Sequence, residues 1–168
     1  MPRTCITRSA ALLRYPTDDR TKALLDIVSE VLRMDEPRRR FGATMSGLDI
    51  QYDLGSGHPL LGRRMPDLDI ITSEGPRRVF TLLRDAHAVL INFGGPGALE
   101  LSAWADRVRL VDAKYFGEWE LPALGAIAAP DAVLVRPDGY VAWVGDGSDV
   151  VLTDALSRWF GPPSVARR

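Results

Sequence analysis

Cysteine and histidine are scarce in this sequence, which limits the chemistry that it can carry. Its 168 residues include a single cysteine, Cys5, and two histidines, His58 and His87. One cysteine cannot form an internal disulfide or a thiol-based metal cluster. The two histidines show no recognisable spacing to a serine nucleophile or to metal-binding carboxylates. We therefore predict no metal site and no catalytic residue, and we expect both histidines to have incidental or structural roles.

An excess of charge and a long apolar run are also missing. The 21 basic and 22 acidic residues leave a net charge of −1, so charge alone gives no reason to expect binding to nucleic acid or to an anionic membrane. No apolar run approaches the ~20 residues that cross a bilayer. The first residues lack the apolar core of a secretory signal. These absences favour a cytoplasmic protein with no nucleic-acid or membrane partner.

The last third of the sequence contains the signature of a β-hairpin followed by a helix. The strand-like runs 132–135 and 140–144 flank a turn in which Gly139 tolerates a positive φ. Apolar residues with helical spacing follow, with Ser148 as the N-cap and Gly161 as the C-terminal stop. A hairpin with a terminal amphipathic helix is the closing half of a thioredoxin-like domain.

The middle of the sequence predicts the rest of a mixed sheet. Residues 87–93 form a nearly unbroken apolar run, which is typical of a central strand buried on both faces. A helix over 98–105 and a parallel strand over 108–112 should follow it. Before it we expect a strand over 68–72, a turn at 74–76, and a segment over 78–83 that is helix or strand, with helix favoured. The predicted fold class is α/β, a thioredoxin-like mixed β-sheet flanked by helices, with an N-terminal helical extension.

That extension should consist of two helices and a short strand. The first helix, capped by Thr17 or Asp18, should run to about Met34 with an apolar stripe, and the second should begin at Asp35 and stop at Gly47. The expected organisation is an extension ending in a strand over 48–52 (1–54), a Gly- and Pro-rich connector (55–67), a thioredoxin-like domain (68–163) and a tail (164–168).

The turn after the central strand occupies the place of the thioredoxin redox motif. Redox-active thioredoxins carry Cys-Gly-Pro-Cys there, beside a helix N-terminus that stabilises a thiolate. The corresponding residues here are Gly94, Gly95, Pro96 and Gly97, so no dithiol chemistry is possible at this turn. The turn is either a tight structural turn, which we favour, or an anion site formed by free amides. Pro130 stands at the place of the thioredoxin cis-proline, and we predict a cis bond before it.

Three charged residues of the connector are the candidate binding residues. Arg63 and Arg64 could contact an anion or the carboxylates of a partner. Asp67 lies near Asp69 and Glu74 in the sequence, which leaves a general acid/base role open beside a structural one.

The residues then match a known family. Ser46-Gly47-Leu48-Asp49-Ile50-Gln51-Tyr52-Asp53, followed by residues 58–67, resembles a junction in FAD-dependent aromatic hydroxylases that act on polycyclic aromatic polyketides in actinobacterial antibiotic pathways. Residues 104–108 and 136–143 are similar to the C-terminal thioredoxin-like domain of these enzymes, and the likeness runs from about residue 8 to Pro163. The hydroxylases bind FAD through an N-terminal Gly-x-Gly-x-x-Gly motif that this chain lacks, so none of their flavin or substrate residues can be assigned here.

The resemblance implies an accessory or dissociated C-terminal domain of a flavin-dependent polyketide hydroxylase, acting through protein association. FAD, with NADPH, is implied only for a partner oxygenase, and no autonomous hydroxylation is expected. The N-terminal helices should expose apolar surface and bind that oxygenase or a second copy in a dimer. The alternatives are a module that binds an aromatic polyketide between those helices and the sheet, a cofactor-independent polyketide-modifying enzyme, and a truncated chain.

Overall fold

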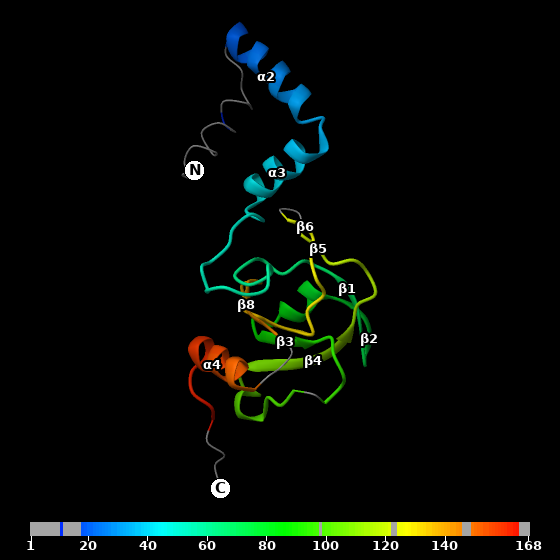
Figure 1. Cartoon of the computed structure of the whole chain (residues 1–168), viewed down its shortest axis with the longest axis vertical. Coiled ribbons are helices and arrows are strands. Elements are labelled where there is room, and N and C mark those ends of the chain that lie inside the picture. Colours follow the sequence, from blue (N-terminus) through cyan, green and yellow to red (C-terminus); the bar gives the residue numbers. More distant parts are fainter. Residues whose placement is uncertain (1–10, 12–17, 98, 122–123, 146–148, 165–168) are drawn as a thin grey trace. The chain divides into compact units, whose positions relative to one another are not determined.

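The protein divides into two compact units, residues 1–49 and 50–168. The computed structural model in Figure 1 describes residues 11, 18–97, 99–121, 124–145 and 149–164. The expected N-cap Ser148 of the last helix and the lone Cys5 lie outside the described residues.

Between residues 18 and 49, the first unit forms two helices close to the predicted positions. Helix α2 spans Asp19–Val31, and the Asp18 carboxylate caps it by accepting a 2.7 Å hydrogen bond from Thr21 N. This bond holds the pKa of Asp18 below its usual value. Helix α3 spans Asp35–Ser46 and ends at Gly47, whose φ of 74° is the left-handed conformation of a helix C-cap. Helix α2 ends three residues before the expected Met34.

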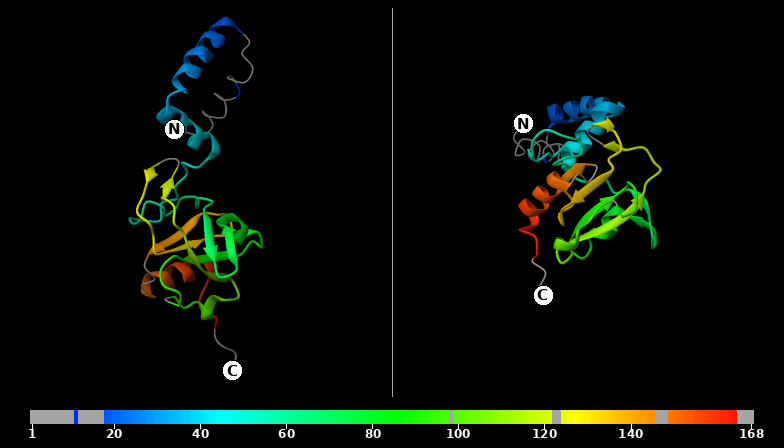
Figure 2. Two further views of the ribbon diagram at one scale, coloured as in Figure 1. Left: turned by 90° about the vertical axis from the view of Figure 1, so that its right-hand side faces the viewer. Right: turned by 60° about the horizontal axis from the view of Figure 1, so that its bottom comes forward.

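The second unit is built on a six-stranded mixed sheet. Its strands are β1 (Asp69–Thr72), β2 (Gly75–Arg78), β3 (Ala88–Asn92), β4 (Val108–Lys114), β7 (Ala132–Val135) and β8 (Val141–Gly145), in the spatial order β2-β1-β4-β3-β7-β8. The β3–β4 pair is parallel and the other pairs are antiparallel. Helix α4 (Asp149–Phe160) contacts β8 (Figures 1 and 2) and ends at Gly161, whose φ is 82°. The predicted thioredoxin-like mixed sheet is confirmed.

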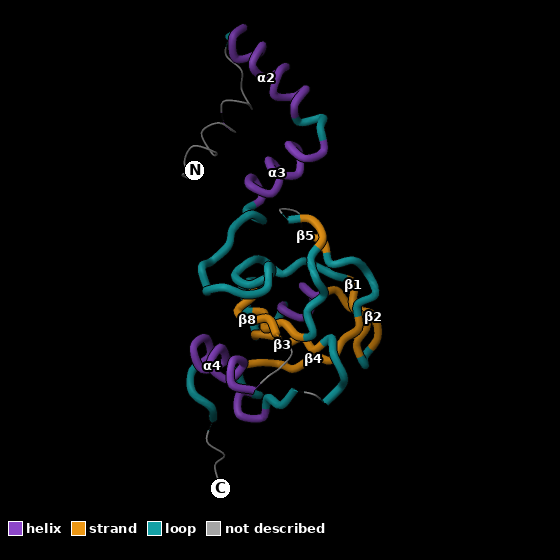
Figure 3. The backbone as a smooth tube through the Cα atoms, in the orientation of Figure 1, coloured by secondary structure: helices purple, strands orange, loops and turns teal. Residues whose placement is uncertain are grey.

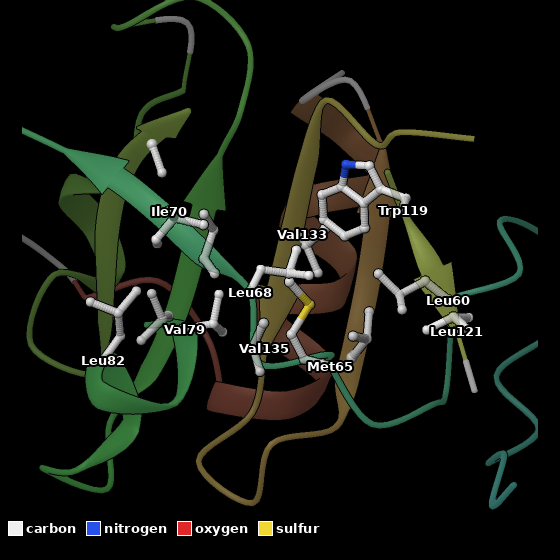
Figure 4. Packing of buried hydrophobic residues seen from close by; sticks show 14 residues of the cluster. Leu60, Met65, Leu68, Ile70, Val79, Leu82, Trp119, Leu121, Val133 and Val135 are labelled. Atoms are coloured by element: carbon white, nitrogen blue, oxygen red, sulfur yellow. The ribbon is translucent and has the colours of Figure 1, made fainter. Parts of the chain in front are cut away.

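The sheet separates two apolar cores because successive side chains of a strand point to opposite faces. Val89 and Ile91 of β3 belong to the first core, whereas Ala88 and Leu90 belong to the second. The first core, shown in Figure 4, also contains Leu60, Met65, Leu68, Val79, Trp119, Leu121, Val133 and Val135. The second is completed by Leu99, Leu101, Trp104, Leu134, Trp143, Leu152 and Leu156. All five residues of β3 are buried, as the apolar run predicted.

The helix expected over 98–105 is wrong for the described part of that range. Only a 3-10 turn, η2 (Ser102–Trp104), is present (Figure 3). Leu99 and Leu101 are both buried in the second core. A spacing of two residues suits an extended segment and would place them on different sides of a helix, so packing favours the extended form.

The other local expectations are partly correct. Residues 78–83 begin as the end of β2 and continue as a 3-10 helix, η1 (Val79–Leu83). The turn expected at 74–76 lies at 73–74, and the strand expected over 48–52 is reduced to one bridge between Gln51 and Arg63. Two further short strands, β5 (Glu120–Leu121) and β6 (Gly125–Ala126), form a hairpin that the sequence analysis did not predict.

The cis bond predicted before Pro130 is not present. Ala129 and Pro130 are joined by a trans peptide, as are the other described residues. The trans form of an X–Pro bond is favoured by about 0.5–1 kcal/mol. The expectation rested on the position of Pro130 in the thioredoxin pattern, and the turn in that pattern carries glycine at both cysteine positions here.

Candidate functional site

The structure gives Arg63 and Arg64 separate partners. Arg63 Nη2 donates a 2.8 Å hydrogen bond to Gln51 Oε1, and the Arg64 guanidinium lies over the Phe80 ring at 5.3 Å from its centroid. Their backbones form antiparallel bridges to Gln51 and Tyr140 respectively. Neither side chain is arranged with the other as a two-arginine clamp for one anion.

Asp67 has a structural role in this geometry. Its Oδ1 accepts a 2.9 Å bond from Phe80 N, and its Oδ2 accepts a 2.9 Å bond from Arg78 Nε. The first bond supplies a partner to an amide in the first turn of η1, which has no partner within the helix. Asp67 therefore joins the segment before β1 to η1, and these donors occupy both of its oxygens.

His58 joins the same connector to the segment before β7. Leu60 N donates to His58 Nδ1 at 3.2 Å, which assigns the ring proton to Nε2. That nitrogen then donates to Ala128 O at 3.0 Å. His58 is a structural histidine, as expected for a histidine without catalytic partners.

The turn at residues 94–97 is organised by Asn92, a residue that the sequence analysis did not single out. The buried Asn92 amide donates to Gly95 O at 3.0 Å and to Asp112 Oδ1 at 2.6 Å, and its oxygen accepts from Gly94 N at 3.0 Å. Asp131 O also accepts from Gly94 N. The signal for this role was one polar residue near the end of an otherwise apolar run.

This geometry does not provide the phosphate cradle considered for the turn. The Gly94 amide is already used twice, by Asn92 and Asp131. Gly97 has a φ of 79°, and described residues 99–101 are not helical, so no helix N-terminus follows at the described positions. A structural turn is the role that these contacts support.

Replacing Asn92 tests this reading of the turn. We expect Asn92→Ala to lower the free energy of unfolding by about 2 kcal/mol, because it removes three hydrogen bonds and leaves buried polar groups unpaired. Asp112→Asn is the matched control, because it retains an oxygen that can accept from Asn92 and should cost less than about 1 kcal/mol. Urea unfolding followed by tryptophan fluorescence measures both, and equal losses would contradict the proposed role.

Other kinds of site are not found in the described part of the chain. It contains no group of three or more His, Cys, Asp or Glu side chains that could hold a metal ion. None of its helices has both the length and the apolar character needed to cross a membrane.

The most unusual surface lies on the N-terminal helices. No residue of α2 is buried. Leu24, Ile27 and Val31 are 54%, 61% and 43% exposed and follow one another at spacings of three and four residues. Leu25, Val28 and Leu32 are half-buried on a neighbouring side of the same helix. Met34, Phe41 and Met45 add exposed apolar area to this unit. We call Leu24, Ile27 and Val31 the α2 stripe.

Comparison with known proteins identifies the family to which these features belong. Residues 58–163 match the family described as aromatic-ring hydroxylase, C-terminal. The chain is 42% identical over 164 residues to 12-dehydrotetracycline 5-monooxygenase/anhydrotetracycline 6-monooxygenase of Streptomyces rimosus, covering 95% of this chain and 31% of that protein. It is 33% identical over 141 residues to a rifampicin monooxygenase of Rhodococcus hoagii, covering 83% of this chain and 26% of that protein.

Solved structures show the same relationship. The OxyS anhydrotetracycline hydroxylase from Streptomyces rimosus aligns with a TM-score of 0.69 and 38% identity, covering 94% of this chain and 32% of that one. CabE, an aromatic hydroxylase from angucycline biosynthesis, aligns with a TM-score of 0.68 and 41% identity, covering 86% of this chain and 30% of that one. The chain thus spans about a third of the length of the relatives that it matches. The relatives named above are monooxygenases and hydroxylases, and the chain itself belongs to the aromatic-ring hydroxylase C-terminal family.

Proposed function

We propose that this chain is an accessory or dissociated C-terminal domain that binds the FAD-bearing part of an aromatic polyketide hydroxylase in antibiotic biosynthesis. The family match and the names of the relatives support the kind of enzyme. The role itself is association, without dithiol redox activity and without hydroxylation by this chain alone. The complex is cytoplasmic in this proposal.

The α2 stripe is the observation that carries the proposal. Soluble monomers rarely leave a contiguous row of large apolar side chains in water, and such rows mark surfaces that contact other proteins. The relatives are about three times as long as the part matched here, so they contain further protein that such a surface can contact. The other partner that the α2 stripe could bind is a second copy of the chain.

In this proposal the chain holds no flavin of its own. The one glycine-rich turn after a buried strand, Gly94–Gly97, has its first amide engaged by Asn92 and lacks a following helix at described positions 99–101. A dinucleotide site needs free amides at such a helix N-terminus. FAD therefore belongs to the partner in this proposal, and no flavin-dependent step is assigned to this chain.

The decisive experiment is co-purification with the flavin-dependent oxygenases encoded near its gene. We expect the chain alone to be colourless and to elute with a yellow flavoprotein when the two are mixed. Ile27→Glu should weaken this association at least about tenfold, because burying an isoleucine side chain contributes ~1.5–3 kcal/mol and a glutamate would lose it. Titration calorimetry measures the two affinities.

Ser29→Glu is the matched control for this variant. Ser29 is exposed on the opposite side of α2 from Ile27, so the same charge there should leave the affinity within about twofold. If neither variant weakens binding, the α2 stripe is not the contact. If the chain binds none of these oxygenases but forms a dimer that Ile27→Glu dissociates, self-association replaces the proposal.

A further inference from the structure

A groove of about 550 Å³ lies within the second unit. It is lined by β4, the tip of the β1–β2 hairpin, Leu82 of η1, and Gly94 and Pro96 of the turn after β3. The six consecutive residues 109–114 of β4 all line it. Because a strand directs alternate side chains to opposite faces, a groove on one face would be lined by every second residue. The groove therefore includes the edge of β4 that lies beside the β1–β2 hairpin.

That edge is largely open. Strand β1 pairs with β4 only at Ala113 and Lys114, after which the hairpin turns at residues 73–74. On its other side, β4 pairs with β3 from Val108 to Asp112. Within the described part of the chain, residues 109–112 thus have no strand partner on the groove side. Alternate N–H and C=O groups of such an edge are available to an incoming strand.

Positively charged side chains outnumber negatively charged ones along this groove. Three cations (Arg77, Arg109, Lys114) and two anions (Glu74, Asp112) line the groove. Arg77 is paired with Glu74 at 3.0 Å, and Arg109 uses Nη2 to donate to Leu82 O at 2.7 Å, which leaves its other N–H groups for a ligand. Lys114 has no hydrogen bond or ion pair among the described residues.

We propose that the edge of β4 binds an extended peptide with acidic residues, which adds to the sheet as a further strand. Backbone groups of residues 109–112 form the ladder. Arg109, at one end of this open segment, and Lys114, two residues beyond its other end, contact the carboxylates of the peptide. Between them, Leu110, Val111 and the half-exposed Ile71 line the groove with apolar side chains that suit β-branched residues. Main-chain pairing with pockets for alternate side chains is an established mode of peptide recognition.

The chain offers a direct probe, because Lys114 is one of only two lysines. Reductive methylation with a ¹³C label keeps the positive charge. It gives one NMR signal from Lys114 and one from Lys22, which lies on α2, beside the signal of the α-amino group. The ligand is the peptide Ac-Glu-Val-Thr-Val-Thr-Glu-NH2. It should shift the Lys114 signal saturably and leave the Lys22 signal unchanged. In protein with unmethylated lysines, the peptide should also shift the NMR signals of the backbone amides of residues 109–112.

Two control peptides separate the contributions. N-methylation of the central residues removes ladder donors while keeping both carboxylates, and should weaken binding at least about tenfold. Replacement of both glutamates by lysine replaces two ion pairs by like charges and should weaken binding about tenfold or more. Lys114→Gln should weaken binding of the parent peptide only about threefold, because exposed ion pairs contribute little. High salt should make this difference smaller, because it screens the ion pair.

Two results would overturn the proposal. If the N-methylated peptide binds as well as the parent, the groove recognises carboxylates and does not add a strand. If both lysine signals move together without saturating, the contact is general charge attraction. The groove lies wholly within residues 50–168, so the test is independent of association through the α2 stripe.

Discussion

Gly62→Ala is expected to lower the free energy of unfolding by at least about 3 kcal/mol. Gly62 has a φ of 74°, and a Cβ atom built on it would lie 2.1 Å from the backbone oxygen of Tyr52. The backbone there is fixed, because Gly62 N donates to Val141 O and Gly62 O accepts from Tyr52 N. The alanine side chain would therefore break contacts that hold residues 50–65 against the β7–β8 hairpin. Urea unfolding followed by tryptophan fluorescence measures the loss.

Gly55→Ala isolates the role of that contact. Gly55 also has a positive φ, 96°, but a Cβ there meets nothing within 4 Å. It should cost only the strain of the left-handed backbone, about 1–2 kcal/mol. If the two variants lose equal stability, the close approach of Gly62 to Tyr52 does not matter to the fold.

Arg107→Gln is expected to have the second large effect, a loss of about 3 kcal/mol. The Arg107 guanidinium donates to Phe160 O at 2.5 Å, to Pro162 O at 3.0 Å and to Ser164 Oγ at 2.8 Å. One of these acceptors is the carbonyl of Phe160, the last residue of α4, which has no partner within the helix. A cation there also interacts favourably with the negative end of the helix dipole. The variant removes that charge and leaves the carbonyls unpaired.

Arg158→Gln is the control for lost charge. Arg158 lies on α4 near the same terminus but is exposed, so its replacement should cost less than about 1 kcal/mol. Thermal unfolding by circular dichroism compares the two variants. A loss for Arg107→Gln no larger than that for Arg158→Gln would show that charge, and not the set of hydrogen bonds, is the contribution.

The same residue predicts a pH dependence. Arg107 Nε donates to Asp106 at 3.1 Å, and this bond is the main reason that the pKa of Asp106 lies below its usual value of 3.8. A carboxyl with a lowered native pKa stabilises the folded state above its unfolded pKa, and that contribution is lost as the pH falls through the native value. Arg107→Gln should therefore flatten the part of the acid unfolding curve that Asp106 contributes.

Local patterns predicted much of the fold. The caps at Asp18 and Gly47, the hairpin turn at Gly139 and the stop at Gly161 all lie where side-chain chemistry or a positive φ required them. The apolar run before Gly94 gave the central strand because burial on both faces removes alternation. Each of these features is determined by residues close to it in the sequence, so a local pattern is enough to predict it.

The errors arose where distant residues decide the structure. Leu99 and Leu101 follow the second core rather than helix propensity. The roles of Asn92 and Arg107 depend on partners 20 and more than 50 residues away, which one sequence does not reveal. For the candidate site, the sequence predicted the apolar character of the N-terminal helices. The open edge of β4 depends on which strands pair, so no local pattern predicted it.

The burial of residues 60–65 determines how far upstream a fragment that contains the second unit must begin in order to fold. Leu60 and Met65 are fully buried, although the stretch that contains them has the composition of a linker. Losing a buried leucine or methionine costs about 2–5 kcal/mol, and whole domains are stable by only about 5–15 kcal/mol. A fragment that begins at residue 68 would lose both side chains together with the bonds from Gly62 and Met65 to the hairpin. A fragment that folds as an independent domain therefore has to begin upstream of Tyr52.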